Sequence, residues 1–77
     1  MYYTYVLASP DGKHYIGSTS DLKRRVGRHN AGNVSSTKSR GELKLVYFEA
    51  CLSKERALVR EKYFKTGFGR RYLRNRI

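Results

Sequence analysis

Two tyrosines near the start of the chain, Tyr5 and Tyr15, lie in short apolar stretches that flank a Ser-Pro-Asp-Gly turn. A phenol in such a place can fill a core, stack on a nucleic-acid base or transfer a proton. Which role applies depends on the side chains that the fold brings beside it. Charged residues on faces that should be apolar are therefore the most informative neighbours.

An arginine and a histidine lie toward the buried side of the first predicted helix. On a helical wheel, Leu22 and Val26 mark the apolar stripe. His29 projects between them, and Arg25 lies beside it, four residues earlier. Arg25 could instead extend to solvent or pair with Asp21, and His29 could be a partly buried structural histidine. The spacing alone leaves these roles open.

A carboxylate occupies the apolar face of the second predicted helix. Ala57, Leu58 and Phe64 define this face, and Glu61 lies near the middle of their arc. A buried carboxylate is costly unless it is paired, hydrogen-bonded or bound to a metal ion. Two interpretations stay open: an ion pair with Arg25, or a ligand for a hard divalent cation, which takes oxygen ligands and keeps waters.

The elements that must position these residues are predicted in the order ββαβαα. Strands are predicted at 2–8, 13–18 and 43–50, and helices from a cap at Thr19 or Ser20 to about Asn30, from a cap at Ser53 to about Gly67, and at 69–77. Both faces of the first strand are apolar, which is typical of a central strand covered on both sides. The fold class predicted is α/β (α+β), a small sheet with helices packed against it.

The predicted hairpin of the first two strands brings the two phenols together. Tyr5 and Tyr15 can lie near each other across the strands. Gly17 shares the face of Tyr15 and leaves room for a ligand or a close backbone approach. Two tyrosines, an arginine, a histidine and a glutamate would then converge on one patch.

The charge balance indicates a polyanionic partner. The 77 residues contain 17 lysines and arginines against 6 acidic residues, which gives a net charge of +11. Nucleic acid is the first candidate. A membrane surface is disfavoured, because the basic residues are not gathered on one long amphipathic helix.

Length and composition set further bounds. A chain of this size favours one domain, over residues 1–77, with a small core. The single cysteine, Cys51, excludes an internal disulfide framework, and the cysteines and histidines are too few for a typical zinc site. No signal-peptide pattern and no apolar run of about 20 residues is visible, so we expect a cytoplasmic protein.

Four short segments resemble the GIY-YIG nuclease superfamily. The sequence YIG at 15–17 matches the second half of the motif that names the family, and of its first half, here YTY at 3–5, the last tyrosine is kept. Further along, Arg25 matches the catalytic arginine, His29 a polar position that is often His or Tyr, and Glu61 the metal-binding glutamate. The resemblance covers nearly the whole chain. It is greatest to short standalone members related to the nuclease module of the DNA-repair protein UvrC.

The resemblance implies a three-stranded antiparallel sheet flanked by helices and an endonuclease that hydrolyses a phosphodiester of DNA with Mg²⁺ or Mn²⁺. Tyr5 or Tyr15 would accept a proton from the attacking water, with a pKa lowered by the cationic surroundings and with His29 as a relay. Arg25 would hold the scissile phosphate. Glu61 would hold the metal ion.

Other basic residues are expected to contact the nucleic-acid backbone, with an ordinary solvated charge as the alternative for each: Lys38, Arg40, Arg70, Arg71 and Arg74. Two other classes stay open. One is a non-catalytic nucleic-acid-binding domain that keeps the fold; the other is a ribosomal-type structural protein, which has no use for Glu61 on an apolar face. The sequence does not distinguish duplex, nicked or branched DNA from RNA, and a partner protein could supply specificity.

Overall fold

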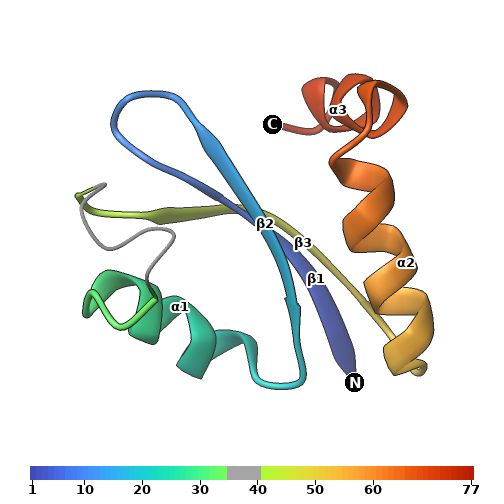
Figure 1. The fold of residues 1–77 in the computed structure, drawn as a ribbon, viewed down its shortest axis with the longest axis horizontal. Coiled ribbons are helices and arrows are strands. Elements are labelled where there is room, and N and C mark those ends of the chain that lie inside the picture. Colours follow the sequence, from blue (N-terminus) through green and yellow to red (C-terminus); the bar gives the residue numbers. More distant parts are fainter. Residues whose placement is uncertain (35–40) are drawn as a thin grey trace.

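The computed structural model describes residues 1–34 and 41–77 (Figure 1). In these ranges the elements are β1 (Tyr2–Ala8), β2 (His14–Thr19), α1 (Leu22–Asn30), β3 (Lys44–Cys51), α2 (Lys54–Phe64) and α3 (Gly67–Arg74). This is the predicted order ββαβαα. No helix in the described part of the chain is long and apolar enough to cross a membrane.

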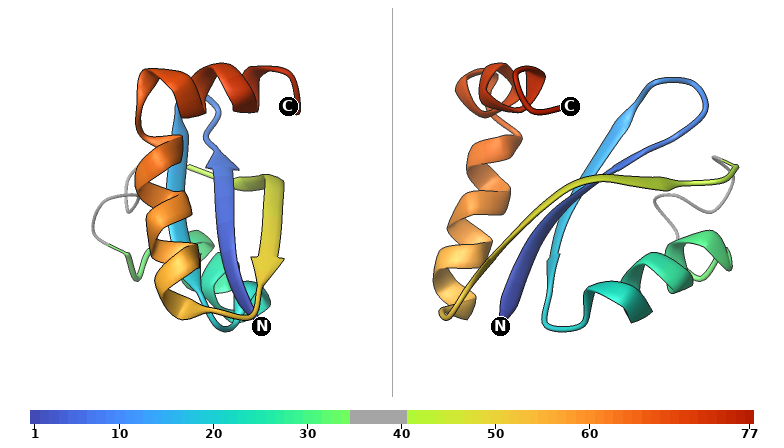
Figure 2. Two further views of the ribbon diagram at one scale, coloured as in Figure 1. Left: turned by 90° about the vertical axis from the view of Figure 1, so that its right-hand side faces the viewer. Right: turned by 180° about the vertical axis from the view of Figure 1, so that it is seen from behind.

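The sheet is antiparallel throughout its described strands, in the order β2-β1-β3. The two-sided apolar pattern of β1 is explained by its central position. Helix α1 covers one face of the sheet, and α2 and α3 lie on the other (Figures 1 and 2). The predicted three-stranded sheet flanked by helices is therefore confirmed.

Alternate residues of β1 supply two small cores, because successive side chains of a strand point to opposite faces. Tyr5 and Leu7 pack with Leu43 and the apolar side of α1. Val6 packs with residues of the other two helices, including Phe64. Each helix layer is thus fixed to the same central strand.

The start of α1 differs from the prediction. Asp21 caps the helix, and its Oδ1 accepts a hydrogen bond from the Arg24 N–H at 3.1 Å. Thr19 instead supports the preceding turn, since its Oγ1 accepts from the Asp21 N–H at 3.1 Å. Ser, Thr and Asp all cap helices well, so residue type alone did not single out Asp21 over the two predicted caps.

The ends of the other helices agree better with their signals. Ser53 caps α2 as expected, accepting from the Arg56 N–H at 3.2 Å. Gly32 follows α1 with a φ of +77°, a backbone conformation that glycine adopts without strain. Helix α3 begins earlier than predicted because the hydroxyl of Thr66 accepts from the Gly69 N–H.

The apolar face of α2 is narrower than the sequence suggested. Ala57 and Phe64 are buried, but Leu58 is 43% exposed. The expectation that Leu58 packs in the core is therefore wrong. Leu58 lies about 100° around the helix from Ala57, so a helix that rests on a small sheet along the Ala57–Phe64 line leaves it at the side.

Candidate active site

The second strand makes space for the phenol of the first. Tyr5 lies opposite Gly17 in the β1–β2 register. A Cβ atom on Gly17 would lie 2.6 Å from Cζ of Tyr5, far inside van der Waals contact. Glycine at this position therefore allows the Tyr5 ring to lie over β2. The group that approaches Gly17 closely is the Tyr5 side chain.

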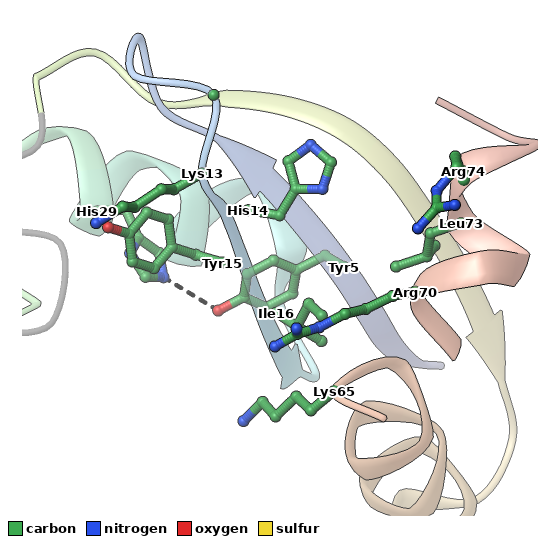
Figure 3. Close-up of a pocket in the computed structure, with 11 residues that line it drawn as sticks. Tyr5, Lys13, His14, Tyr15, Ile16, His29, Lys65, Arg70, Leu73 and Arg74 are labelled. Carbon is green, nitrogen blue, oxygen red and sulfur yellow. Dashed lines mark hydrogen bonds between the residues drawn. The ribbon is translucent and has the colours of Figure 1, made fainter. Parts of the chain in front are cut away.

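Helix α1 brings a histidine to the Tyr5 phenol. The Tyr5 Oη and the His29 Nε2 are 3.1 Å apart, and the rings meet edge to face at 5.9 Å (Figure 3). Both residues are buried, with 2% and 7% of their surface exposed. The helical face predicted for His29 is thus the face that meets the sheet.

Burial and charge move the pKa values of this pair apart. Burial raises the pKa of the Tyr5 phenol above its usual value of 10.0, although the hydrogen bonding and charge of Arg25 oppose this rise. Burial, together with the charges of Arg25 and Arg28, lowers the pKa of His29 below 6.5. At neutral pH the pair is therefore a protonated phenol beside a neutral imidazole. The expectation of a lowered pKa is wrong for Tyr5, because desolvation outweighs the nearby cation.

Tyr15 lies on the same face of the hairpin as Tyr5. It stands opposite Leu7 in the register, two pairs along from the Tyr5–Gly17 pair. Its ring is partly buried against the core under α1 and borders the same cleft as Tyr5. The predicted proximity of the two phenols is a diagonal one, because glycine takes the position directly opposite Tyr5.

A cleft of about 730 Å³ opens beside these residues, and we call it the main cleft. Its cationic lining comes from the β1–β2 turn, from the residue after α2, and from α3: Lys13, Lys65, Arg70 and Arg74. These side chains surround Tyr5 and Tyr15 in Figure 3. None of the residues that line the main cleft is an Asp or a Glu.

The backbone-contact residues predicted from the sequence divide into three groups. Arg70 and Arg74 line the main cleft, whereas Arg71 is exposed and does not border it. Lys38 and Arg40 lie outside the described residues. Sequence reasoning missed Lys13 and Lys65; a usable signal was that Lys65 follows Glu61 by one helical turn.

Glu61 is half-buried rather than buried, with 21% of its side chain exposed. Its Oε2 accepts a hydrogen bond from the Lys65 Nζ at 2.9 Å. The ion pair of Glu61 in the described part of the chain is thus with Lys65, and the alternative of a pair with Arg25 is not what the structure has. Glu61 lines neither the main cleft nor the pocket beside Arg25, and after burial its charge adds to the raised pKa of Tyr5.

Arg25 is not among the residues that line the main cleft, although it acts on the pair at that cleft. It acts on the pKa values of both Tyr5 and His29. It also lines a pocket of about 370 Å³ with residues at the end of β2 and the start of α2. Tyr2 lines this small pocket too, whereas Tyr3 packs against the Phe48 ring at 6.1 Å.

The donor set suits a loosely held hard cation. The described residues contain no group of three or more His, Cys, Asp or Glu side chains that could hold a metal ion. A single carboxylate such as Glu61 fits Mg²⁺ or Mn²⁺, because these ions keep several waters and share oxygen ligands with substrate phosphates. It does not fit a closed structural site.

Fold and site together define a small α+β domain with a buried tyrosine–histidine pair that opens onto a cationic cleft. The model of the GIY-YIG catalytic domain matches residues 1–74. The chain therefore belongs to the GIY-YIG family, a membership that carries a nuclease-type fold, and the resemblance drawn from the motif residues is confirmed.

Similar proteins carry names that give no activity. The UPF0213 protein spr1390 of Streptococcus pneumoniae R6 is 44% identical over 64 residues, 82% of this chain and 65% of its own length. The UPF0213 protein CPE1444 of Clostridium perfringens is 42% identical, over 84% of this chain and 71% of that protein. The solution structure of the UPF0213 protein BH0048 from Bacillus halodurans has a TM-score of 0.60 and 34% identity, and covers 97% of this chain and 84% of that one.

Proposed function

We propose that this protein is a metal-dependent endonuclease that hydrolyses a phosphodiester bond of DNA in the main cleft. The observation that carries the proposal is the buried Tyr5–His29 pair, which opens onto a cleft lined by cations and no carboxylate. A structural protein gains nothing from a desolvated proton-transfer pair at the floor of such a cleft. Membership of the GIY-YIG family supports the same class of activity.

In this proposal Tyr5 and His29 move one proton. The neutral His29 accepts through Nε2, which requires the tautomer with its proton on Nδ1. As the water oxygen bonds to phosphorus, the water gives a proton to the Tyr5 oxygen and the phenol passes its own proton to His29. The bond from phosphorus to the leaving oxygen breaks, and solvent protonates that oxygen. A phenol with a raised pKa is suited to this relay, because it gains one proton as it gives up another and so does not have to exist as a phenolate.

The cations and Glu61 would serve the phosphate. Arg25 would bind the scissile phosphate and stabilise the charge that develops there, and Arg70 and Arg74 would hold neighbouring phosphates. Glu61 would hold a divalent cation, which when bound would supply charge neutralisation on the leaving side. Tyr15 would shape the cleft around the water. The proposed setting is the cytoplasm, with a partner protein or a structured substrate providing specificity.

The direct test uses a panel of labelled duplex, nicked, branched and single-stranded DNA and RNA, with Mg²⁺ and with Mn²⁺. We expect cleavage of at least one DNA substrate that EDTA abolishes. Tight binding to the panel without any cleavage in either metal would favour the non-catalytic nucleic-acid-binding domain. If only RNA were cleaved, phosphodiester hydrolysis would be retained in the proposal and its substrate would be RNA rather than DNA.

A further inference from the structure

The small pocket and the main cleft lie along the same strand, which is the edge strand β2. The main cleft is lined by residues at the start of β2, including Tyr15, and the small pocket by Ser18 and Thr19 at its end. In the described sheet β2 pairs with β1 alone, so its outer edge is open. The two openings thus mark the two ends of one edge.

Both flanking helices repeat this order. On α1, His29 lines the main cleft and Arg25 lines the small pocket. At the ends of α2, Lys65 borders the main cleft and Lys54 the small pocket. Glu61 lies between these two lysines in the sequence of the helix. Each of β2, α1 and α2 therefore borders the main cleft at one point and the small pocket at another, so the two openings follow one another along β2.

The chemistry of the small pocket suits a phosphate group. Lys54 adds a positive charge next to that of Arg25, which binds the scissile phosphate in the proposed function, and none of the lining residues is acidic. Ser18 and Ser20 add hydroxyl-bearing residues to its lining, whereas the hydroxyl of the neighbouring Thr19 is bonded to the backbone of Asp21. Phosphate oxygens are recognised by this combination of cations and hydroxyl donors. Lys54 is also the first residue of α2, where the positive end of the helix dipole adds to the field.

We infer that the small pocket binds a phosphate that flanks the scissile one, so that the substrate strand runs along the open edge of β2 and contacts both ends. Lys54 is the residue that this subsite adds to the site already described. The inference rests on the proposed function for the position of the scissile phosphate. The contact itself is a binding contact and does not depend on whether the bond is cut.

The test measures binding in EDTA, where no cleavage occurs, for the wild type, Lys54→Ala and the control Lys62→Ala. Lys62 is exposed on the same helix and lines neither opening. Losing one phosphate contact should weaken binding about fivefold to tenfold at 0.1 M salt and reduce the log–log salt slope by about one. Lys62→Ala should change affinity less than about twofold, as expected for a charge outside the contact surface.

A second arm identifies the phosphate. Each phosphate of a short labelled oligonucleotide is replaced in turn by an uncharged methylphosphonate. One replacement beside the cleavage site should weaken the wild type and leave Lys54→Ala unaffected, which is the signature of a shared contact. Equal losses for Lys54→Ala and Lys62→Ala, or no replacement with this pattern, would overturn the subsite. A wild type that binds with this pattern but never cuts would keep the subsite and remove the proposed function.

Discussion

Two regions of the molecule, the Arg60 cluster and the main cleft, both contain tyrosine and arginine side chains, but their charges are used differently. On the α2–α3 face, Arg60 donates to Glu49 at 2.8 Å and lies 4.6 to 5.0 Å from the centres of three aromatic rings, those of Tyr63, Phe64 and Tyr72. The same carboxylate accepts from the Tyr47 hydroxyl at 3.1 Å. The charged and polar groups of this cluster are therefore paired with one another within the protein.

The main cleft, which opens at the β2 edge and takes lining residues from α1 as well as from α3, has no such internal pairing of its arginines among the described residues. Arg70 and Arg74 border it, and neither has an ion pair within the described part of the chain. The phenol of Tyr5 faces a neutral histidine rather than a carboxylate. The contrast shows that residue types alone do not define a reactive site. A reactive site also needs charges that are not paired within the protein, next to a buried pair of groups that can exchange a proton.

The sharpest way to break this contrast is to remove one hydroxyl from each region. Tyr5→Phe should reduce cleavage by a factor of about 100 or more, because it deletes the group that exchanges protons with His29. Tyr47→Phe should leave the cleavage rate unchanged and reduce the free energy of unfolding by about 1 to 2 kcal/mol, since it loses the hydrogen bonds of Tyr47 to Glu49 and Tyr72. Single-turnover cleavage and chemical denaturation measure the two effects. If both variants cleaved at the wild-type rate, the phenols would serve packing alone.

The pH dependence should follow His29. Protonation of His29 removes the acceptor for the phenol proton, so the cleavage rate should fall in acid with a midpoint below 6.5. Because the pKa of His29 is lower in the folded protein, its contribution to stability is present above pH 6.5 and is lost as the pH falls through the folded value. His29→Asn should weaken this loss of unfolding free energy on acidification. An acid midpoint above 6.5 would argue against a neutral, buried histidine.

Two arginines test the division between binding and stability. Arg70→Ala should weaken nucleic-acid binding about fivefold to tenfold at 0.1 M salt, through one lost phosphate contact, and leave stability unchanged. Arg60→Ala should cost about 2 kcal/mol of unfolding free energy, since it removes an ion pair and contacts with aromatic rings. Its effect on binding should be small. If the two variants exchanged these effects, the roles assigned to the Arg60 cluster and to the main cleft would be reversed.

The smallest expected effect concerns the Glu61–Lys65 ion pair. Lys65→Ala frees the carboxylate, so half-maximal cleavage should need about half as much Mg²⁺, in line with the small energy of such pairs one turn apart. Affinity for nucleic acid should fall, because Lys65 also borders the main cleft. A higher Mg²⁺ requirement would show that Lys65 supports the carboxylate rather than competing for it.

Much of this arrangement follows from patterns within single elements. The strand and helix order, the buried face of His29 and the glycine beside Tyr5 were predictable because each depends on local periodicity and turn chemistry. The close match of motif residues to a known family added the nuclease-type fold.

What the sequence could not supply depends on packing between elements. The placement of α2 against the sheet decides which residue pairs with Glu61. The same placement leaves Leu58 exposed. The direction of the Tyr5 pKa shift depends on a balance between burial and the distance to Arg25. Lys13 and Lys65 became recognisable only when the fold placed a turn and the end of a helix at one cleft.

The central claim is that Glu61 serves the reaction through a metal ion, and one comparison tests it most directly. Glu61→Gln keeps the size of the side chain and removes the charge that a cation needs. The control is Glu55→Gln, an exposed glutamate on the same helix that borders neither the main cleft nor the small pocket. We predict that Glu61→Gln loses cleavage in Mg²⁺ and in Mn²⁺ while it binds nucleic acid as tightly as the wild type, with a change in unfolding free energy of less than about 1 kcal/mol. A folded Glu61→Gln protein that cuts at the wild-type rate in either metal would contradict the account.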